Sequence, residues 1–553
     1  HDNDSCPYRH FRRIAKILAI CKNTLRSAKW VKTPKTERMI RLIPAVGDIY
    51  CVFVEKLQKY TACQVTSFKE SESGKSSKLI SLLELDWLSD TLPDDAELLT
   101  MKPLSCDFYF WNNNLQHSYV EAAVPKDYIK AGNIPPLLPG ETNSYGTWNV
   151  GGSIYRQWQW EQIPAEKRQL FKQAAKDDAL ITLGTRSLRR STNVVWEDML
   201  AELDDVSELE KLPCLTKIHA AEASASLLAF VKNNPFIIEL HLGKTLMSSI
   251  DLSGSQIRKL FIQNAQGLEK LTLNKGLTNL TIGSDISPDL HIEADEDGYW
   301  LSAGFTSSPP DFHGLPRLSG LHLHQVTELD LLPIVQRFPE LQEMRLWGKP
   351  GTISNLDSIS QLSKLASFST YDIFGFSADQ FPPPQQLPRL STLWMTSLPA
   401  DAAKSIKTAY KQESKRGLNL SITKPRNPEW LANNLTNPFR DWDGRENITA
   451  AQAKKAADQY KKTATALTAL QKQDSELPKA ADLEAALLEL VAAYTLAFNK
   501  MDRRTGFIET VEREEIYVVL HDLLDSTKQS LAAQGLAIDL APLFERFDQL
   551  RDF

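Results

Sequence analysis

Three patterns follow one another along this 553-residue chain and together predict a multidomain α+β protein. Alternating β-branched and aromatic residues come first, which is typical of strands. An apolar-x-x-apolar-x-apolar motif then recurs from Leu215 to Ile422, as in the strands of leucine-rich repeats. Alanine-rich segments with helical periodicity come last. We therefore expect a small N-terminal β-rich domain, a central irregular leucine-rich-repeat solenoid and a C-terminal α-helical bundle.

The charge of the chain is unevenly distributed. Its formal net charge is −6, but residues 1–38 carry ten Lys and Arg against three acidic residues, so that segment has +7 and the remainder −13. An acidic body argues against a general nucleic-acid binder and suits a basic protein partner, although ordinary solubility explains it equally well. The basic segment is interpreted as an interaction arm, a targeting segment, or a stretch upstream of a natural start at Met39. The last is favoured because the strand pattern begins directly after Met39.

The cysteine content and the hydropathy indicate the cellular compartment in which the protein is expected. The six cysteines are sparse and form no CxxC pair, which favours reduced thiols in a cytoplasmic protein over a disulfide scaffold or a zinc site. No run approaches the roughly 18 apolar residues of a membrane span, so no membrane partner is expected.

Residues 39–140 are expected to form the β-rich domain, as a bent sheet or barrel. Two hairpins are predicted in this domain. One joins 48–54 with 59–68, and the other joins 106–111 with 116–122 across three asparagines. One further strand is expected between the hairpins, at 79–85.

Two short motifs in this domain carry a family resemblance. Pro44-Ala-Val-Gly-Asp48 opens one strand, and Tyr60-Thr-Ala-Cys-Gln64-Val follows in the next. Over about residues 40–140 the chain resembles the immunity protein 26 family, in which a Pro-x-x-Gly-Asp strand precedes a Tyr-x-x-x-Gln-Val strand. That family belongs to bacterial polymorphic toxin systems, so the resemblance implies a protein that binds and silences a cognate toxin. The same Gly47-Asp48 pair is also explained as the turn that starts a strand.

Residues 141–210 are predicted to hold a linker and capping helices. The stretch 139–160 is rich in Gly, Asn and Trp and is expected to be a linker whose tryptophans pack on a neighbouring domain. Helices are expected at 164–176 and 195–210, where they would cover the hydrophobic end of the first repeat.

The solenoid is assigned to residues 211–424 and is expected to be irregular. Its repeats shorten to 9–11 residues between Leu260 and Ile292, which predicts strands joined by tight turns. The stretch 295–312 is expected to protrude as an insertion beside the concave face, and a convex helix is predicted at 330–337. The α-helical domain is assigned to residues 425–553, with helices at 449–472, 480–499, 509–531 and 540–551.

The concave face of the solenoid is the predicted binding surface. Side chains alternate across a strand, so the residue between the last two apolar positions of each motif points outward. That column is read as His219, His241, Phe261, Thr272, Thr281, His291, His322, Arg345, Ser369, Trp394 and Ser421, and the next position adds Gln263, Asn274, Glu293, His324 and Trp347. The selected protein-binding residues are His241, Phe261, His291, His322, His324, Arg345, Trp347 and Trp394. Arg, His and Trp are typical of interface hot spots, although any polar solenoid face holds some of them by chance.

No reaction chemistry is predicted, and neither a metal nor a cofactor is expected. His322 and His324 lack a Cys or carboxylate at ligand spacing, and Asp502 to Glu509 has arginines where calcium needs oxygen ligands. The acidic stretch 441–446 is better explained as a turn before a helix than as an active site.

The leading hypothesis is a non-enzymatic scaffold, an immunity protein that occludes a bacterial toxin. A leucine-rich-repeat adaptor is the second hypothesis. An enzyme is the third, with its site at Asp441 or at Cys63 or Cys106 beside His117.

Overall fold

The computed structural model describes residues 44–69, 79–138, 140–471 and 480–553. The basic segment 1–38, with its three interpretations, lies outside these residues, as do Cys6 and Cys21. The chain divides into two units after Leu42.

The N-terminal domain is a five-stranded antiparallel sheet in the order β6-β3-β2-β1-β7. Its elements are β1 (Asp48–Val54), β2 (Lys59–Lys69), β3 (Leu79–Ser89), α2 (Asp95–Leu98), β4 (Ser105–Cys106), β5 (Asn114–Leu115), β6 (His117–Glu121) and β7 (Ile129–Asn133). The expected hairpin of 106–111 with 116–122 is wrong. Only β4 and β5 pair there, because Tyr109 and Asn113 turn the chain with φ of 49° and 55°, and β6 pairs with β3 instead.

The motif residues that carry the family resemblance hold this sheet together. Gly47 has φ +90°, and a Cβ there would lie 2.4 Å from the carbonyl oxygen of Ile134, so only glycine fits without rearrangement. The buried Asp48 carboxylate accepts a hydrogen bond from the Asn133 amide at 2.8 Å and pairs with Lys130 at 2.7 Å. Both residues of this Gly-Asp pair thus have a structural role.

The stretch between the sheet and the solenoid is more ordered than expected. It contains α3 (Gly152–Glu161), α4 (Ala165–Ala174), a hairpin of β8 (Leu180–Leu183) with β9 (Arg186–Arg189), α5 (Glu197–Leu200) and η1 (Val206–Lys211). The prediction of a linker over 139–160 is therefore wrong from Gly152 onward. Trp160 is buried against Phe171 and Phe236, whereas Trp158 is 46% exposed.

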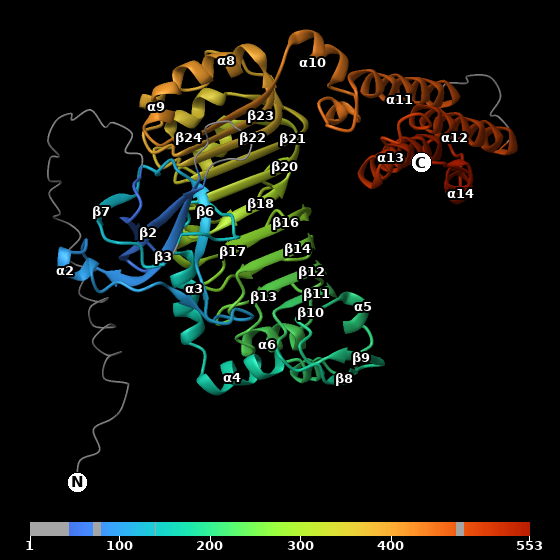
Figure 1. Ribbon diagram of the computed structural model, residues 1–553. Helices are drawn as coiled ribbons and strands as arrows, with labels where there is room; N and C mark the ends of the chain where they lie inside the picture. The colour runs from blue at the N-terminus through green and yellow to red at the C-terminus, as the bar shows by residue number, and fades with distance from the viewer. Residues whose placement is uncertain (1–43, 70–78, 139, 472–479) are drawn as a thin grey trace. The chain divides into compact units, whose positions relative to one another are not determined.

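The solenoid is built around an eleven-stranded parallel sheet whose strands follow one another in chain order (Figure 1). The strands are β10 (Val194–Val195), β11 (Lys217–Glu222), β12 (Glu239–Lys244), β14 (Lys259–Ala265), β16 (Asn279–Ile286), β18 (Ser302–Thr306), β20 (Gly320–Asp330), β21 (Glu343–Ser354), β22 (Ser367–Phe374), β23 (Thr392–Pro399) and β24 (Asn419–Arg426). The first apolar residue of each strand aligns with its counterpart on the next, so that Ile218, Leu240, Leu260 and Leu280 form one buried row. The leucine pattern thus sets the register.

A second parallel sheet explains the apparent shortening of the repeats. Its strands are β13 (Ser249–Asp251), β15 (Lys270–Thr272), β17 (His291–Glu293) and β19 (His313–Gly314), in that order. Strands of the two sheets alternate along the chain, so Leu260 and Leu271 belong to opposite sides of one coil. The expected strands with short connections are therefore present, but the expected shortening of the repeat is wrong: the repeat keeps a length near 20 residues here, from Leu260 to Leu280.

The stretch 295–312 is part of the solenoid and not a protruding insertion. It contains η2 (Asp295–Gly298) and strand β18, which pairs with β16 and β20 in the large sheet. Other coils return through helices, as the sequence predicts for 330–337, where Asp330 caps the helix that follows. These helices are α6 (Ala225–Asn233), α7 (Leu331–Arg337), η3 (Leu356–Gln361), η4 (Pro384–Gln386), α8 (Ala400–Ala409) and α9 (Lys411–Lys415).

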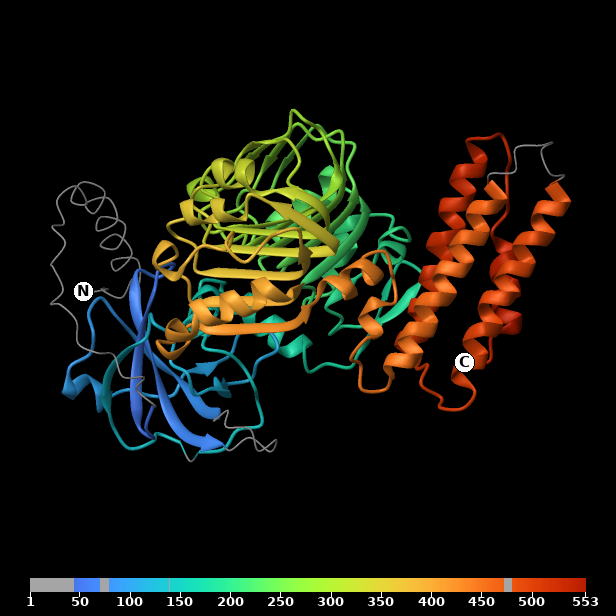
Figure 2. The same cartoon turned by 90° about the horizontal axis from the view of Figure 1, so that it is seen from above.

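The C-terminal region is a helical bundle with its own core (Figure 2). After α10 (Pro428–Asn434) and η5 (Arg440–Trp442), it contains α11 (Ala450–Gln471), α12 (Ala480–Asp502), α13 (Thr510–Ala532) and α14 (Ala541–Leu550). The four expected helices are therefore present. Among the helices within the described residues, none has the length and hydropathy needed to cross a membrane.

Candidate functional site

The side of the eleven-stranded sheet that points away from the apolar core is the candidate binding surface, and we call it the open face. One column of this face crosses ten consecutive strands in register. It consists of His219, His241, Phe261, Thr281, Gly304, His322, Arg345, Ser369, Trp394 and Ser421. Ten residues from distant parts of the sequence, nine of them with side chains, thus form one continuous row.

Seven of the eight selected residues lie on the open face. His241, Phe261, His322, Arg345 and Trp394 belong to the central column, and His324 and Trp347 lie in the column beside it.

The placement of His291 on this face is wrong, because His291 begins β17 of the second sheet and is paired with Lys270 and His313. Thr272 and Glu293 belong to that sheet as well. Asn274 is buried next to it, where its amide donates to the carbonyl of Ile257 at 2.8 Å.

Four stacked rings cover the first strands of the open face. Trp196 lies on His219 with ring centroids 4.1 Å apart, His219 on His241 at 4.0 Å, and His241 on Phe261 at 4.1 Å. The planes are nearly parallel, with angles of 20°, 21° and 8°. Contacts between aromatic rings stabilise a pair by about 0.5–1.5 kcal/mol, so this ladder is a pre-ordered stack.

Trp196 is the member of the ladder that the sequence analysis missed. It follows Val195, which pairs with Ile218, so Trp196 occupies the same position as His219. Val195 matches the apolar position that directly precedes the outward-pointing residue in the repeat motif, so the sequence does indicate Trp196. The residue was missed because a helix was expected over 195–210.

Burial keeps part of this ladder uncharged. Burial lowers the pKa of His219, and the neighbouring His241 lowers it further. The His219 ring, which resists protonation, therefore lies uncharged between Trp196 and His241 near neutral pH.

The middle of the open face is organised around one carboxylate. Glu343 accepts from His322 Nε2 at 3.1 Å and from Arg345 Nε at 2.7 Å. Burial opposes ionisation of Glu343, but the hydrogen bonds from His322 and Arg345 outweigh it, and the pKa of the carboxyl is lowered. The guanidinium of Arg345 is thereby held in one orientation while its side chain remains 46% exposed.

Two exposed tryptophans lie beyond this cluster. Trp347 is 45% exposed and packs edge-on against His324 at 4.9 Å. Trp394 is 46% exposed and donates from its indole to Asn419 at 3.1 Å. Both rings are therefore held by neighbours yet offer apolar area to a partner, as interface anchors do.

The acidic stretch at 441–446 serves the architecture. Asp441 accepts from the hydroxyl of Tyr371, on the open face, at 3.0 Å. Asp443 pairs with Arg426 at 2.9 Å. Arg445 holds Glu512 at 2.7 Å. These contacts connect the end of the solenoid with the helical bundle, as expected for a structural turn.

The cysteine candidates lack the surroundings of a nucleophile. Burial raises the pKa of the Cys63 thiol well above its usual range and that of Cys106 to about 11. His117 Nε2 hydrogen-bonds the hydroxyls of Thr66 and Ser81. In the part of the chain that the structure describes, no group of three or more His, Cys, Asp or Glu is placed to hold a metal ion.

Comparisons with known proteins add little to this description. No protein-family model matches the chain, and no curated protein does. Among solved structures, internalin C2 from Listeria monocytogenes strain 4b F2365 is similar at 17% identity, over 39% of this chain and 83% of that one, with a TM-score of 0.15. A likeness at that score carries no argument, so the solenoid rests on its own repeats and strand pairing.

Proposed function

We propose that this protein is a non-enzymatic scaffold that binds a protein partner through the open face of its solenoid. The observation that carries the proposal is the set of exposed, pre-positioned anchors on that face. Trp347, Trp394 and Arg345 are each fixed by a neighbouring side chain while about half of their surface remains exposed. Residues of these types, held rigid, contribute most of the binding free energy in many protein interfaces.

The residues between the anchors support the same interpretation. Ser367, Ser369, Thr392, Thr396 and Ser421 line the neighbouring positions of β22 to β24. Small hydroxyl side chains around large aromatic anchors are the composition of antibody paratopes, where they supply adaptable hydrogen bonds at low entropic cost. A protein surface with mixed polar and apolar groups is the partner that such a face recognises.

The experiment is affinity capture with the whole chain followed by quantitative mass spectrometry. The double variant Arg345→Ala with Trp394→Ala should lose the specific partner, with binding at least a hundredfold weaker in a follow-up titration. Trp158→Ala is the matched control, since Trp158 is as exposed as Trp394 but lies on α3, outside the open face. Unchanged binding by the double variant would refute the proposal.

The narrower form of the proposal is an immunity protein that occludes a bacterial toxin, in which the solenoid and the N-terminal sheet hold the toxin and cover its active site. The resemblance of residues 40–140 to the immunity protein 26 family supports it, although no family model matches. Co-expression with a toxin encoded beside its gene should restore growth, and the double variant should not. A partner that retains its activity in the complex would favour an adaptor instead.

A further inference from the structure

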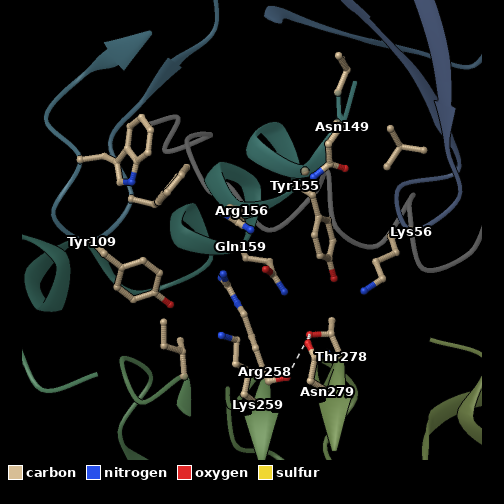
Figure 3. A pocket seen from close by; sticks show the side chains of 18 of the residues that line it. Lys56, Tyr109, Asn149, Tyr155, Arg156, Gln159, Arg258, Lys259, Thr278 and Asn279 are labelled. Atoms are coloured by element: carbon tan, nitrogen blue, oxygen red, sulfur yellow. Dashed lines mark hydrogen bonds between the residues drawn. The ribbon is translucent and has the colours of Figure 1, made fainter. Parts of the chain in front are cut away.

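A second surface of the molecule has the features of a small-ligand site. A cavity of about 800 Å³ lies where the β1–β2 turn, helix α3 and the first residues of several solenoid strands meet. Figure 3 shows side chains from all three of these segments pointing into it. This volume is within the range of about 300–1,000 Å³ that is usual for ligand pockets.

The lining of the cavity is rich in cations. Lys56 comes from the β1–β2 turn and Arg156 from α3, while Arg258 directly precedes β14 and Lys259 begins it. Among the described residues, Lys56, Arg156 and Arg258 form no ion pair. Lys259 is 3.7 Å from Glu239. Three cationic groups thus share one cavity without a carboxylate partner.

The acidic residues of the lining do not offset these charges. Glu239 is already engaged by Lys217 at 2.6 Å and by His241 at 2.7 Å. Asp127 is the other acidic residue of the lining, so two carboxylates face four cations. The cavity therefore keeps an excess of positive charge.

The cations lie close enough to repel each other. Burial lowers the pKa of Lys56, and the charge of Arg258 lowers it further. Burial also lowers the pKa of Arg258, and the charge of Arg156 lowers it further. Like charges held together in a partly buried cavity destabilise the fold unless a counter-charge is supplied, since proteins normally pair buried charged groups. A bound anion would supply that counter-charge.

Aromatic and amide groups complete the site. The Lys56 ammonium lies 5.6 Å from the ring centre of Tyr155, and the Arg258 guanidinium 5.7 Å from that of Tyr109. Gln159 and Asn279 add hydrogen-bonding groups. A ligand therefore meets flat apolar walls as well as cations.

We propose that this cavity binds a small molecule with two or more linked phosphate groups. Two guanidinium groups favour phosphate, because their planar forks donate paired hydrogen bonds to its oxygens, and a third cation suits a second phosphate group. The tyrosine rings provide a surface for a ring attached to the phosphates, as in a nucleoside diphosphate. The shared chemistry is the diphosphate, which a nucleotide or free pyrophosphate supplies.

The test is calorimetric titration of the full chain with ADP, pyrophosphate, orthophosphate and citrate. ADP or pyrophosphate should bind at least tenfold more tightly than orthophosphate and citrate, with affinity that falls as salt rises. If ADP binds more tightly than pyrophosphate, the site is assigned to a nucleotide. If the two bind equally, the site is assigned to the inorganic ion.

Charge-removing variants connect the binding to this cavity. Arg156→Gln with Arg258→Gln should weaken diphosphate binding at least thirtyfold, and Arg189→Gln should leave it unchanged. Arg189 is 70% exposed on β9 and pairs with Asp178, away from the cavity lining.

Without ligand, the double variant should melt at the same or a higher temperature than the wild type, because repulsion is relieved. This measurement separates lost binding from lost folding. Absence of diphosphate binding, unchanged binding by the double variant, or equally tight citrate binding would overturn the proposal.

Discussion

Arg440 donates from Nε to Asp372 Oδ2 at 2.7 Å and so joins two residues that are sixty-eight positions apart in the chain. Asp372 lies in β22 and Arg440 begins η5, the turn that leads into the helical bundle. Their side chains are only 1% and 12% exposed. This buried ion pair links the solenoid to the C-terminal region that follows it.

Breaking this pair should destabilise the junction. Arg440→Met leaves the buried carboxylate of Asp372 unpaired, so we expect the free energy of unfolding to fall by about 3–5 kcal/mol in denaturant titrations. Adding Asp372→Asn should recover part of that loss, because Asn carries no charge and tolerates the φ of +54° found there. Arg416→Met, which removes an exposed pair with Glu413, should cost less than about 1 kcal/mol. Equal losses in the two single variants would contradict this account.

Glu84 should make stability fall as the pH rises toward neutrality. Burial raises its pKa to about 7 from an ordinary value of 4.5, although the Gly151 amide and the Ser153 hydroxyl donate to it. Between those two values the folded chain holds a proton that the unfolded chain has lost, so stability decreases across this window and is constant above it. Glu84→Gln should match the wild type at pH 4 and exceed it by about 1–3 kcal/mol at pH 8. Parallel stability–pH curves would count against this assignment.

The ring ladder should respond to acid in the opposite direction. Because burial and His241 lower the pKa of His219, the unfolded chain takes up a proton near pH 6.5 before the folded chain does. The contribution of the neutral His219 to stability is therefore complete above that pH and is lost as the pH falls below it. His219→Phe keeps the stack and removes the titrating group. The fall in melting temperature between pH 7.5 and 5.5 should shrink in this variant; a variant as acid-sensitive as the wild type would speak against His219 as the source.

The solenoid and the bundle should unfold as separate cooperative units, since their apolar cores are distinct. Leu321 is fully buried in the first core and Leu487 is 1% exposed in the second. Each Leu→Ala change should cost about 2–5 kcal/mol. In scanning calorimetry, Leu321→Ala should lower one transition and Leu487→Ala another. A single transition that both variants shift would show that the two regions unfold together.

Local patterns in the sequence predicted the open face well and the coil geometry poorly. The motif places Arg345 and Trp394 on one side of the sheet because strand alternation is a local property. The same motif occurs in strands of both sheets, however, and nothing local distinguishes Thr272 of β15 from Thr281 of β16. That difference depends on where the chain returns across the core, which is set by packing between coils.

The cavity was beyond local analysis for a related reason. Lys56, Arg156 and Arg258 are each about a hundred residues from the next, and none belongs to a motif. Only the tertiary arrangement brings the three cations to one place. Sequence analysis detects sites whose residues share a repeat or a helix face, and this site shares neither.

Glu239 contacts residues of both proposed binding sites, the cavity and the open face. Its carboxylate lines the cavity, lies 3.7 Å from Lys259, and holds His241 of the ring ladder at 2.7 Å. If the cavity binds an anion and the open face a protein, as proposed, the anion would compete with Glu239 for Lys259 and the protein would cover His241. We therefore expect the two binding equilibria to be linked, with each ligand changing the affinity for the other by the same factor.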